Sequence, residues 1–280
     1  MKKVSHNLGM GLDLFRKLVL VFCAIITLSF SAYSQDLNED QEISDNGTII
    51  IETETDITKS YKERRGRHGA LFSVFTEAFN PLSYVSGFEN GGTIGDIIAN
   101  SEIQLMGVEL GYKYNVGPGS IAAVFSYSQG GATGQTVSGT VANPSALSFI
   151  KKSIGLNAAA DAITAEPWVV PYGQVSLNFF ESHEEQVISS QSQSADAASG
   201  MMIGYKLGAL FQIDWIESLF DASAKEERLR SSSLENTFID VYYATYLADS
   251  AAAETAESGQ IPPINLESDG QIGVGLKLEF

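Results

Sequence analysis

The last ten residues constrain the fold of this chain more than any other stretch. From Gln271 to Phe280, every even-numbered position is apolar and every odd-numbered position is polar or glycine. Successive side chains of a β-strand point to opposite faces, so this segment predicts a strand with one apolar and one polar face. An edge strand of a globular protein can show the same alternation. A terminal aromatic residue favours a membrane barrel, with lipid outside, a polar interior and aromatic residues at the interface.

The beginning of the chain predicts export. Four basic residues (Lys2, Lys3, Arg16 and Lys17) precede an apolar run over 18–30, and Ala32-Tyr33-Ser34 fits a small-x-small cleavage site. We therefore expect a signal peptide over residues 1–34. A membrane anchor is the alternative, but the run is shorter than the ~20 residues a spanning helix needs. No later run is long enough for such a helix, so helical spans are not predicted beyond the leader.

Charge and cysteine content exclude several classes of function. The whole chain has 17 basic and 34 acidic side chains, and removing residues 1–34 leaves 13 and 33. An excess of acidic residues argues against nucleic acid as a partner, because binding phosphates requires surplus Lys and Arg. The single cysteine, Cys23, lies in the leader, so neither a disulfide nor a thiolate metal site is available afterwards. No cofactor is predicted.

Residues 35–67 predict a periplasmic N-terminal segment that is first acidic and then basic. Its acidic part, 36–45, has little apolar surface to bury. Its basic part, 61–68, directly precedes the first strong strand pattern. Two interpretations stay open: these cations contact lipid phosphates at the membrane face, or they form a solvated charge run.

The rest of the chain, residues 68–280, predicts a closed, antiparallel, eight-stranded transmembrane β-barrel in an all-β fold. Alternation of apolar and polar residues predicts eight strands, at about 69–79, 103–114, 120–127, 149–160, 169–181, 202–213, 238–247 and 271–280. Most reach the ~9–11 residues of a tilted membrane strand. Short connections (115–119 and around Glu166-Pro167) alternate with long polar ones (80–101, 128–148, 182–200 and 248–270). This asymmetry is typical of outer-membrane barrels and places both chain ends on the periplasmic side.

One connection, at about 214–232, predicts a short periplasmic helix instead of a turn. Trp215, Ile216, Leu219 and Phe220 are spaced to share one helical face, and charged residues follow them. We expect an interfacial helix whose apolar face rests on the membrane. The alternative is a helix packed across the barrel mouth.

The leader, the eight alternating strands, the unequal connections and the terminal stretch Gly275-Leu276-Lys277-Leu278-Glu279-Phe280 resemble the OmpA/OmpW-like small outer-membrane barrels of Gram-negative bacteria. The resemblance is one of pattern and covers about residues 69–280. It implies an integral outer-membrane protein surrounded by lipid and lipopolysaccharide, which we expect to be a monomer. It also implies that Leu276, Leu278 and Phe280 form the signal read by the barrel-assembly machinery. The helical connection and the acidic N-terminal segment depart from the family pattern.

The polar faces of the predicted strands carry charges of both signs toward the barrel interior. This inward set comprises Glu109, Lys113, Lys151, Lys206, Asp240, Lys277 and Glu279. Glu77 joins it only if the first strand, whose phase is ambiguous, turns its odd positions inward. Eight strands leave an interior that side chains can fill, and unpaired buried charges are costly. We therefore expect a plugged barrel with a structural or envelope-interaction role; a narrow pore or transporter for small, including hydrophobic, molecules is the alternative, and adhesion through the loops stays open.

Catalysis and metal binding have weaker signals. Ser182, His183 and Glu184 could supply a nucleophile, a base and an orienting acid for a lipid-modifying enzyme, the second alternative. Neighbouring residues of a strand point to opposite faces, so Ser182 and His183 should not meet. His68 has no acidic neighbour, and the loop carboxylates lack the spacing of a calcium loop. We expect no enzymatic activity and no metal site.

Overall fold

The computed structural model describes residues 60–81, 84, 103–138, 141–188, 191–213, 234–247 and 266–280. The predicted signal peptide, residues 35–59 and the helix expected at about 214–232, with Trp215, Ile216, Leu219 and Phe220, lie outside these residues. Within the described ranges, no helix is both long and apolar enough to cross a membrane.

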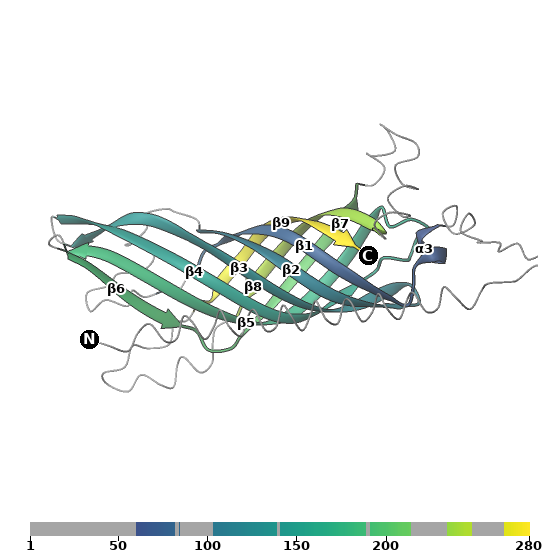
Figure 1. Cartoon of the computed structure of the whole chain (residues 1–280), viewed down its shortest axis with the longest axis horizontal. Coiled ribbons are helices and arrows are strands. Elements are labelled where there is room, and N and C mark those ends of the chain that lie inside the picture. Colours follow the sequence, from purple (N-terminus) through teal and green to yellow (C-terminus); the bar gives the residue numbers. More distant parts are fainter. Residues whose placement is uncertain are drawn as a thin grey trace, which may run out of the picture. The chain divides into compact units, whose positions relative to one another are not determined.

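The described residues form one short helix and nine strands (Figure 1). The helix is α3 (Tyr61–Arg64), and the strands are β1 (His68–Phe79), β2 (Ile103–Val116), β3 (Gly119–Ser138), β4 (Val141–Ala159), β5 (Val169–Ile188), β6 (Gln191–Ala198), β7 (Met202–Gln212), β8 (Asn236–Tyr246) and β9 (Ser268–Glu279). All eight segments predicted from alternation are strands. Every neighbouring pair is antiparallel, and the pairings β1–β9 and β4–β5 close the sheet into a barrel.

Nine strands make an eight-stranded barrel because β6 and β7 share one position beside β5. β7 pairs with residues 169–178 of β5, and β6 pairs with residues 181–188 of the same strand. The interruption between them is bridged by Ser199, whose backbone N–H donates to the Phe180 carbonyl at 2.9 Å. Its hydroxyl accepts from the Phe180 N–H at 3.0 Å.

Two predicted long loops turn out to be hairpins. Residues 128–148 and 182–200 were expected to be connections, but β3 pairs with β4 up to Ser138↔Val141, and β5 pairs with β6 up to Ile188↔Gln191. Their Gly- and Ser-rich sequences lack the strong apolar face by which a strand is recognised, whereas backbone pairing needs no such face. We call residues 131–138, 141–148, 181–188 and 191–198, which belong to β3, β4, β5 and β6, the strand extension (Figure 1).

The polarity of the barrel is inverted relative to that of a soluble protein. Large apolar side chains are exposed on the outer face of every barrel strand, among them Val74, Met106, Ile121, Leu156, Val175, Leu207, Val241 and Leu276. The alternate positions point inward and bury polar or charged groups. In β1, Ser73, Phe75, Glu77 and Phe79 are all buried, so the odd-numbered positions face the interior. This pattern is that of a barrel with lipid outside.

Glycines on the inner face make room for tyrosine rings. A Cβ atom at Gly273 in β9 would lie 2.1 Å from the Tyr242 ring, and one at Gly208 in β7 would lie 2.7 Å from the Tyr172 ring. No other residue type leaves this space. The narrow barrel therefore accommodates large inward aromatic side chains by placing glycine opposite them.

Candidate functional site in the barrel interior

The middle of the barrel contains a network that joins opposite walls through buried charges. Glu109 of β2 forms ion pairs with Lys277 of β9, at 3.3 Å from Nζ to Oε1, and with Lys206 of β7, at 3.6 Å from Nζ to Oε2. Lys277 also lies 3.7 Å from Asp240 of β8. All four side chains are less than a tenth exposed. Two lysines and two carboxylates thus form one cross-barrel chain.

A second buried pair lies beside this chain. Lys151 of β4 and Glu77 of β1 form an ion pair, and the Tyr246 hydroxyl donates to Glu77 Oε1 at 2.6 Å. Lys151 Nζ donates to the same Tyr246 hydroxyl at 2.5 Å, and Tyr242 donates to Glu77 Oε2 at 3.1 Å. Both carboxylate oxygens of Glu77 therefore have donors.

Aromatic rings complete the surroundings of the buried lysines. Lys206 Nζ lies 4.7 Å from the Tyr242 ring centroid and 4.9 Å from that of Phe75. Lys277 Nζ lies 5.1 Å from the Tyr172 centroid, and the Tyr172 hydroxyl donates to Asp240 at 2.8 Å. Ring faces attract cations most strongly where water is excluded. Three lysines thus face three carboxylates. The tyrosines contact both, with their rings near the lysines and their hydroxyls donating to the carboxylates.

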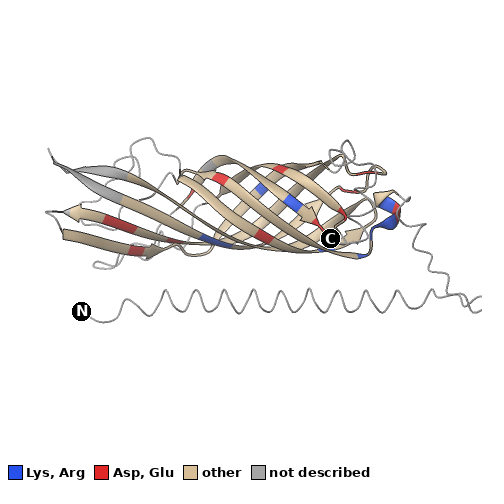
Figure 2. Ribbon diagram, turned by 45° about the horizontal axis from the view of Figure 1, so that its top comes forward, with Lys and Arg blue, Asp and Glu red and all other residues tan. Residues whose placement is uncertain are grey.

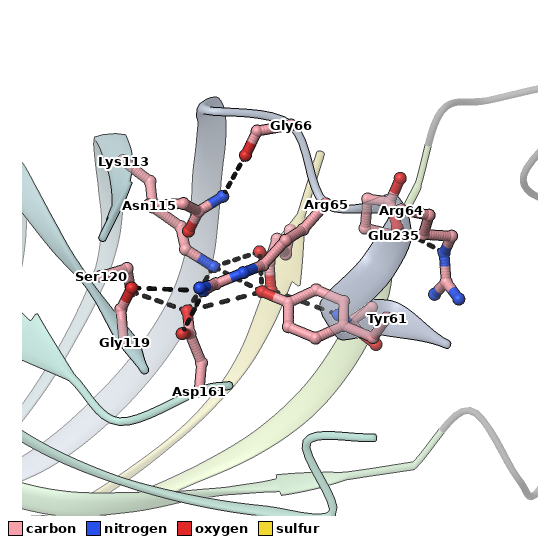
Figure 3. A network of polar contacts seen from close by, with 12 residues as sticks. Tyr61, Arg64, Arg65, Gly66, Lys113, Asn115, Gly119, Ser120, Asp161 and Glu235 are labelled. Atoms are coloured by element: carbon pink, nitrogen blue, oxygen red, sulfur yellow. Dashed lines mark hydrogen bonds and ion pairs between the residues drawn. The ribbon is translucent and has the colours of Figure 1, made fainter. Parts of the chain in front are cut away.

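The short helix α3 lies at one end of the barrel, where its residues join a network of polar contacts (Figure 3). Tyr61 is fully buried, and its hydroxyl donates to Glu279 Oε1 at 2.7 Å while accepting from Lys113 Nζ at 2.7 Å. Lys113 also pairs with Glu279 and lies 2.6 Å from Asp161 Oδ2. Burial, together with the negative charges of Glu279 and Asp161, raises the pKa of Tyr61 far above its ordinary value, so the hydroxyl keeps its proton.

The arginines that follow Tyr61 hold the same end. Arg65 Nη1 donates to Asp161 Oδ1 at 2.9 Å and to the Gly119 carbonyl at 3.2 Å, and Arg64 Nε donates to Glu235 Oε2 at 2.9 Å. Both arginine side chains are less than a tenth exposed. They are therefore engaged with protein carboxylates and are not available to lipid phosphates. We call α3 with Arg65 the mouth cap.

Apolar side chains fill the opposite end of the interior. Phe79 stacks on Phe180, with 5.2 Å between ring centroids, and meets Phe149 edge-on at 5.5 Å. Tyr246 packs edge-on against Phe180 at 5.4 Å. Further buried members of this aromatic cluster are Tyr84, Ile103, Leu105, Leu147, Met202 and Leu266.

The structure brings all seven inward charges expected from the sequence into these networks. Sequence reasoning missed Asp161, Tyr61 and Arg65. Asp161 lies in a turn with no periodic pattern, and the other two belong to the basic segment before β1. Figure 2 shows both signs of charge along the barrel strands. Among the described residues, no cluster of three His, Cys, Asp or Glu side chains is suited to a metal ion.

The residues predicted as the assembly signal lie at the seam where β9 meets β1. Leu276 is exposed on the outer face, paired with Val74 and Ile239. Leu278 and Phe280 are half-buried. Phe280 exchanges two backbone hydrogen bonds with Ala70, of 2.8 and 2.9 Å. Recognition by the assembly machinery stays a prediction.

The histidines and the serine considered for catalysis are separated as alternation requires. Ser182 is buried inside, whereas His183 faces outward. His68 stacks on Tyr112, and its Nδ1 lies 2.7 Å from the Tyr112 hydroxyl.

The chain is similar to several solved structures, all at low sequence identity. No protein-family model and no curated protein matches the sequence. Ail, the attachment invasion locus protein of Yersinia pestis, is 12% identical with a TM-score of 0.37, covering 77% of this chain and all of that chain. The outer membrane protein OprG of Pseudomonas aeruginosa is 9% identical with a TM-score of 0.43, covering 77% and 97%. The N-terminal β-barrel domain of OprF from the same organism is 10% identical with a TM-score of 0.35, covering 76% and 98%.

The class of the protein follows from its own geometry. An eight-stranded closure, an apolar outer face and an interior of paired charges define an integral membrane β-barrel of the small outer-membrane type.

Proposed function

We propose that this protein is a sealed outer-membrane barrel with a structural or envelope-interaction role, its interior plugged by its own side chains. The observation that supports the proposal is an interior of paired buried charges with buried aromatic side chains on either side of it. Tyr61 is fully buried on one side, and the aromatic cluster around Phe79 and Phe180 is buried on the other.

The cost of breaking the buried ion pairs favours a structural role for this network over ion conduction. Each inward lysine of the middle layer has a carboxylate from a different strand, so the ion pairs tie β2 to β7 and β9, β9 to β8, and β4 to β1. Breaking a buried pair leaves an uncompensated charge and typically costs about 3–5 kcal/mol. An ion path would require these pairs to open during each passage, so the arrangement resists permeation.

The mouth cap adds a brace across the closing seam. β1 and β9 share seven paired positions, whereas β1 and β2 share twelve. Tyr61 and Arg65 connect β9, β2 and the β4–β5 turn through Glu279, Lys113 and Asp161. The N-terminal segment thus reinforces the barrel near its shortest ladder and is anchored there in return.

Planar-bilayer recording of the refolded mature chain tests the proposal, after a heat-dependent gel shift has shown that the barrel is folded. We expect no discrete openings from the wild type. Tyr61→Ala removes the buried side chain that we propose closes one end of the barrel. Lys62→Ala, at an exposed neighbour in the same helix, is the matched control. Reproducible single-channel openings in the wild type would overturn the sealed-barrel proposal.

One observation favours the narrow-pore alternative. Within the described residues, the buried polar atoms Ser128 Oγ, Gln174 Nε2 and both amide atoms of Gln271 lack a protein hydrogen-bond partner. Such groups are commonly satisfied by internal water. Small ions would need a continuous hydrated path through the barrel, so the same recording distinguishes isolated waters from such a path.

A further inference from the structure

Carboxylates outnumber cations at the end of the barrel where α3 lies. Asp161 and Glu166 come from the β4–β5 connection, Glu235 precedes β8 and Glu279 ends β9. Among the described residues of the barrel strands, Lys113 is the cation that contacts this group, through Asp161 and Glu279. Together, these five side chains are therefore three charges more negative than positive. We call them the cap socket.

The two arginines of the mouth cap supply the missing positive charge (Figure 3). Arg65 Nη1 lies 2.9 Å from Asp161 Oδ1, and Arg64 Nε lies 2.9 Å from Glu235 Oε2. Arg64 Nη1 also lies 4.0 Å from Glu166 Oε1. Guanidinium groups suit carboxylates because they present several donors in one plane. The socket thus contacts both arginines through charge-assisted pairs.

The socket also recognises Tyr61, through its hydroxyl, its ring and its backbone. The hydroxyl donates to Glu279 Oε1 and accepts from Lys113 Nζ, each at 2.7 Å. Lys113 Nζ lies 5.5 Å from the ring centroid, within reach of a cation–π contact. The Tyr61 N–H donates to Glu166 Oε1 at 3.4 Å. A tyrosine followed at a fixed spacing by two arginines is therefore the sequence that fits this socket.

The segment that carries these groups is closed by its own hydrogen bonds. The Ser60 N–H and hydroxyl donate to Glu63 Oε2 at 3.0 and 2.8 Å, and the Arg65 N–H donates to the Tyr61 carbonyl at 3.0 Å. Residues 66–67 then lead directly into β1. Because these internal contacts involve no other part of the barrel, a different chain can present the same unit.

An empty socket would be electrostatically unfavourable. Asp161 and Glu279 are less than a tenth exposed, and burial raises the pKa of Glu235 although Arg64 beside it acts in the opposite sense. Buried carboxylates without a counter-charge are costly, so the socket favours another cation whenever the cap leaves. The socket can be reached from outside, because the side chains of Glu166 and Glu235 are 24% and 26% exposed.

We propose that the cap socket is a recognition site for basic peptide segments of the sequence Tyr-x-x-Arg-Arg. The chain's own residues 61–65 occupy it in this structure, and a segment of the same chemistry in a partner protein competes for it and releases the N-terminal segment from the barrel. The proposal does not depend on a sealed interior, because it concerns only which segment occupies the socket. Channel openings in the wild type would therefore leave it standing.

Binding of a free peptide to the refolded mature chain tests the proposal. The variant Tyr61→Ala/Arg65→Ala lacks the groups by which its own segment holds the socket, and a heat-dependent gel shift shows that it is folded. Fluorescence anisotropy then measures binding of a labelled peptide of residues 59–66. We expect saturable binding to this variant, and binding about 30-fold weaker or more to the wild type, whose tethered segment competes.

Two controls separate recognition from general attraction between opposite charges. Asp161→Asn, added to the same variant, should weaken peptide binding about 30-fold or more. Asp196→Asn, which removes an exposed carboxylate from the strand extension, should leave it unchanged. A peptide of the same composition in scrambled order should bind weakly and without saturation. Absence of saturable binding to the folded variant, or equal binding of the scrambled peptide, would overturn the proposal.

A spin label measures release of the cap in a chain that keeps Tyr61 and Arg65. Lys62 is exposed and the mature chain contains no cysteine, so Lys62→Cys places one nitroxide on α3. We expect the unlabelled peptide to increase the mobile fraction, with half-release at concentrations on the order of 1 mM or above, as for competition with a short tether. The scrambled peptide should leave the spectrum unchanged. A cap that stays immobile far above this range would contradict displacement.

Discussion

The barrel interior and the outer face of the strand extension both pair cations with carboxylates, but under opposite conditions. Lys277 is 3% exposed and contacts two carboxylates, whereas His183 is 44% exposed and also contacts two carboxylates. Without water, the interior pairs must hold their partners continuously, because a lost partner leaves a buried charge. In water, the outer pairs can exchange at small cost. The same contact pattern therefore gives fixed pairs inside the barrel and exchangeable pairs outside it.

The largest effect should come from breaking the interior chain. Lys277→Ala removes the cation shared by Glu109 and Asp240, so we expect a loss of about 3–5 kcal/mol in the free energy of unfolding. Urea titration in lipid vesicles, followed by gel mobility, measures it. The same substitution at Lys152, whose pair with Glu181 is exposed, should cost less than about 1 kcal/mol. Equal effects at the two sites would remove the distinction between interior and exterior pairs.

A charge on the lipid face should have an intermediate effect. Leu276 is 44% exposed between Val74 and Ile239, so Leu276→Arg should cost ~2–4 kcal/mol if the position lies near the midplane. Vesicle unfolding again provides the measurement, with Leu276→Ala as the control for lost apolar area. A harmless arginine would mean that this face does not contact hydrocarbon.

The smallest effect concerns the protonation of His183. Its raised pKa means that the protonated ring stabilises the fold fully below the unfolded value of about 6.5, and that this contribution is lost as pH rises through the folded pKa. For an exposed pair we expect less than about 1 kcal/mol. NMR titration of His183 in micelles should show a pKa above 6.5 that falls in Asp196→Asn. A titration unaffected by this substitution would contradict the contact.

How far the sequence predicts this structure depends on whether a pattern is local. Alternation within ten residues is local, so it predicted all eight barrel strands and the inward direction of Glu109, Lys206 and Lys277. The mouth cap could not be predicted this way, because Tyr61 meets Glu279 across 218 positions and depends on the closed seam. The contacts of His183 could not be predicted for a related reason. Ser182 adjoins His183 in the chain but faces away, whereas strand register brings Asp196 alongside it.

The interruption at residues 199–201, between β6 and β7, has a consequence for how this protein could vary. At this position around the barrel, the membrane wall and the strand extension are separate strands joined by a short link, so neither dictates the length of the other. Insertions or deletions on the extension side could be absorbed at this link without shifting the register of β7 against β8. The link is therefore a natural graft point, where foreign hairpins could be displayed while the transmembrane part keeps its closure.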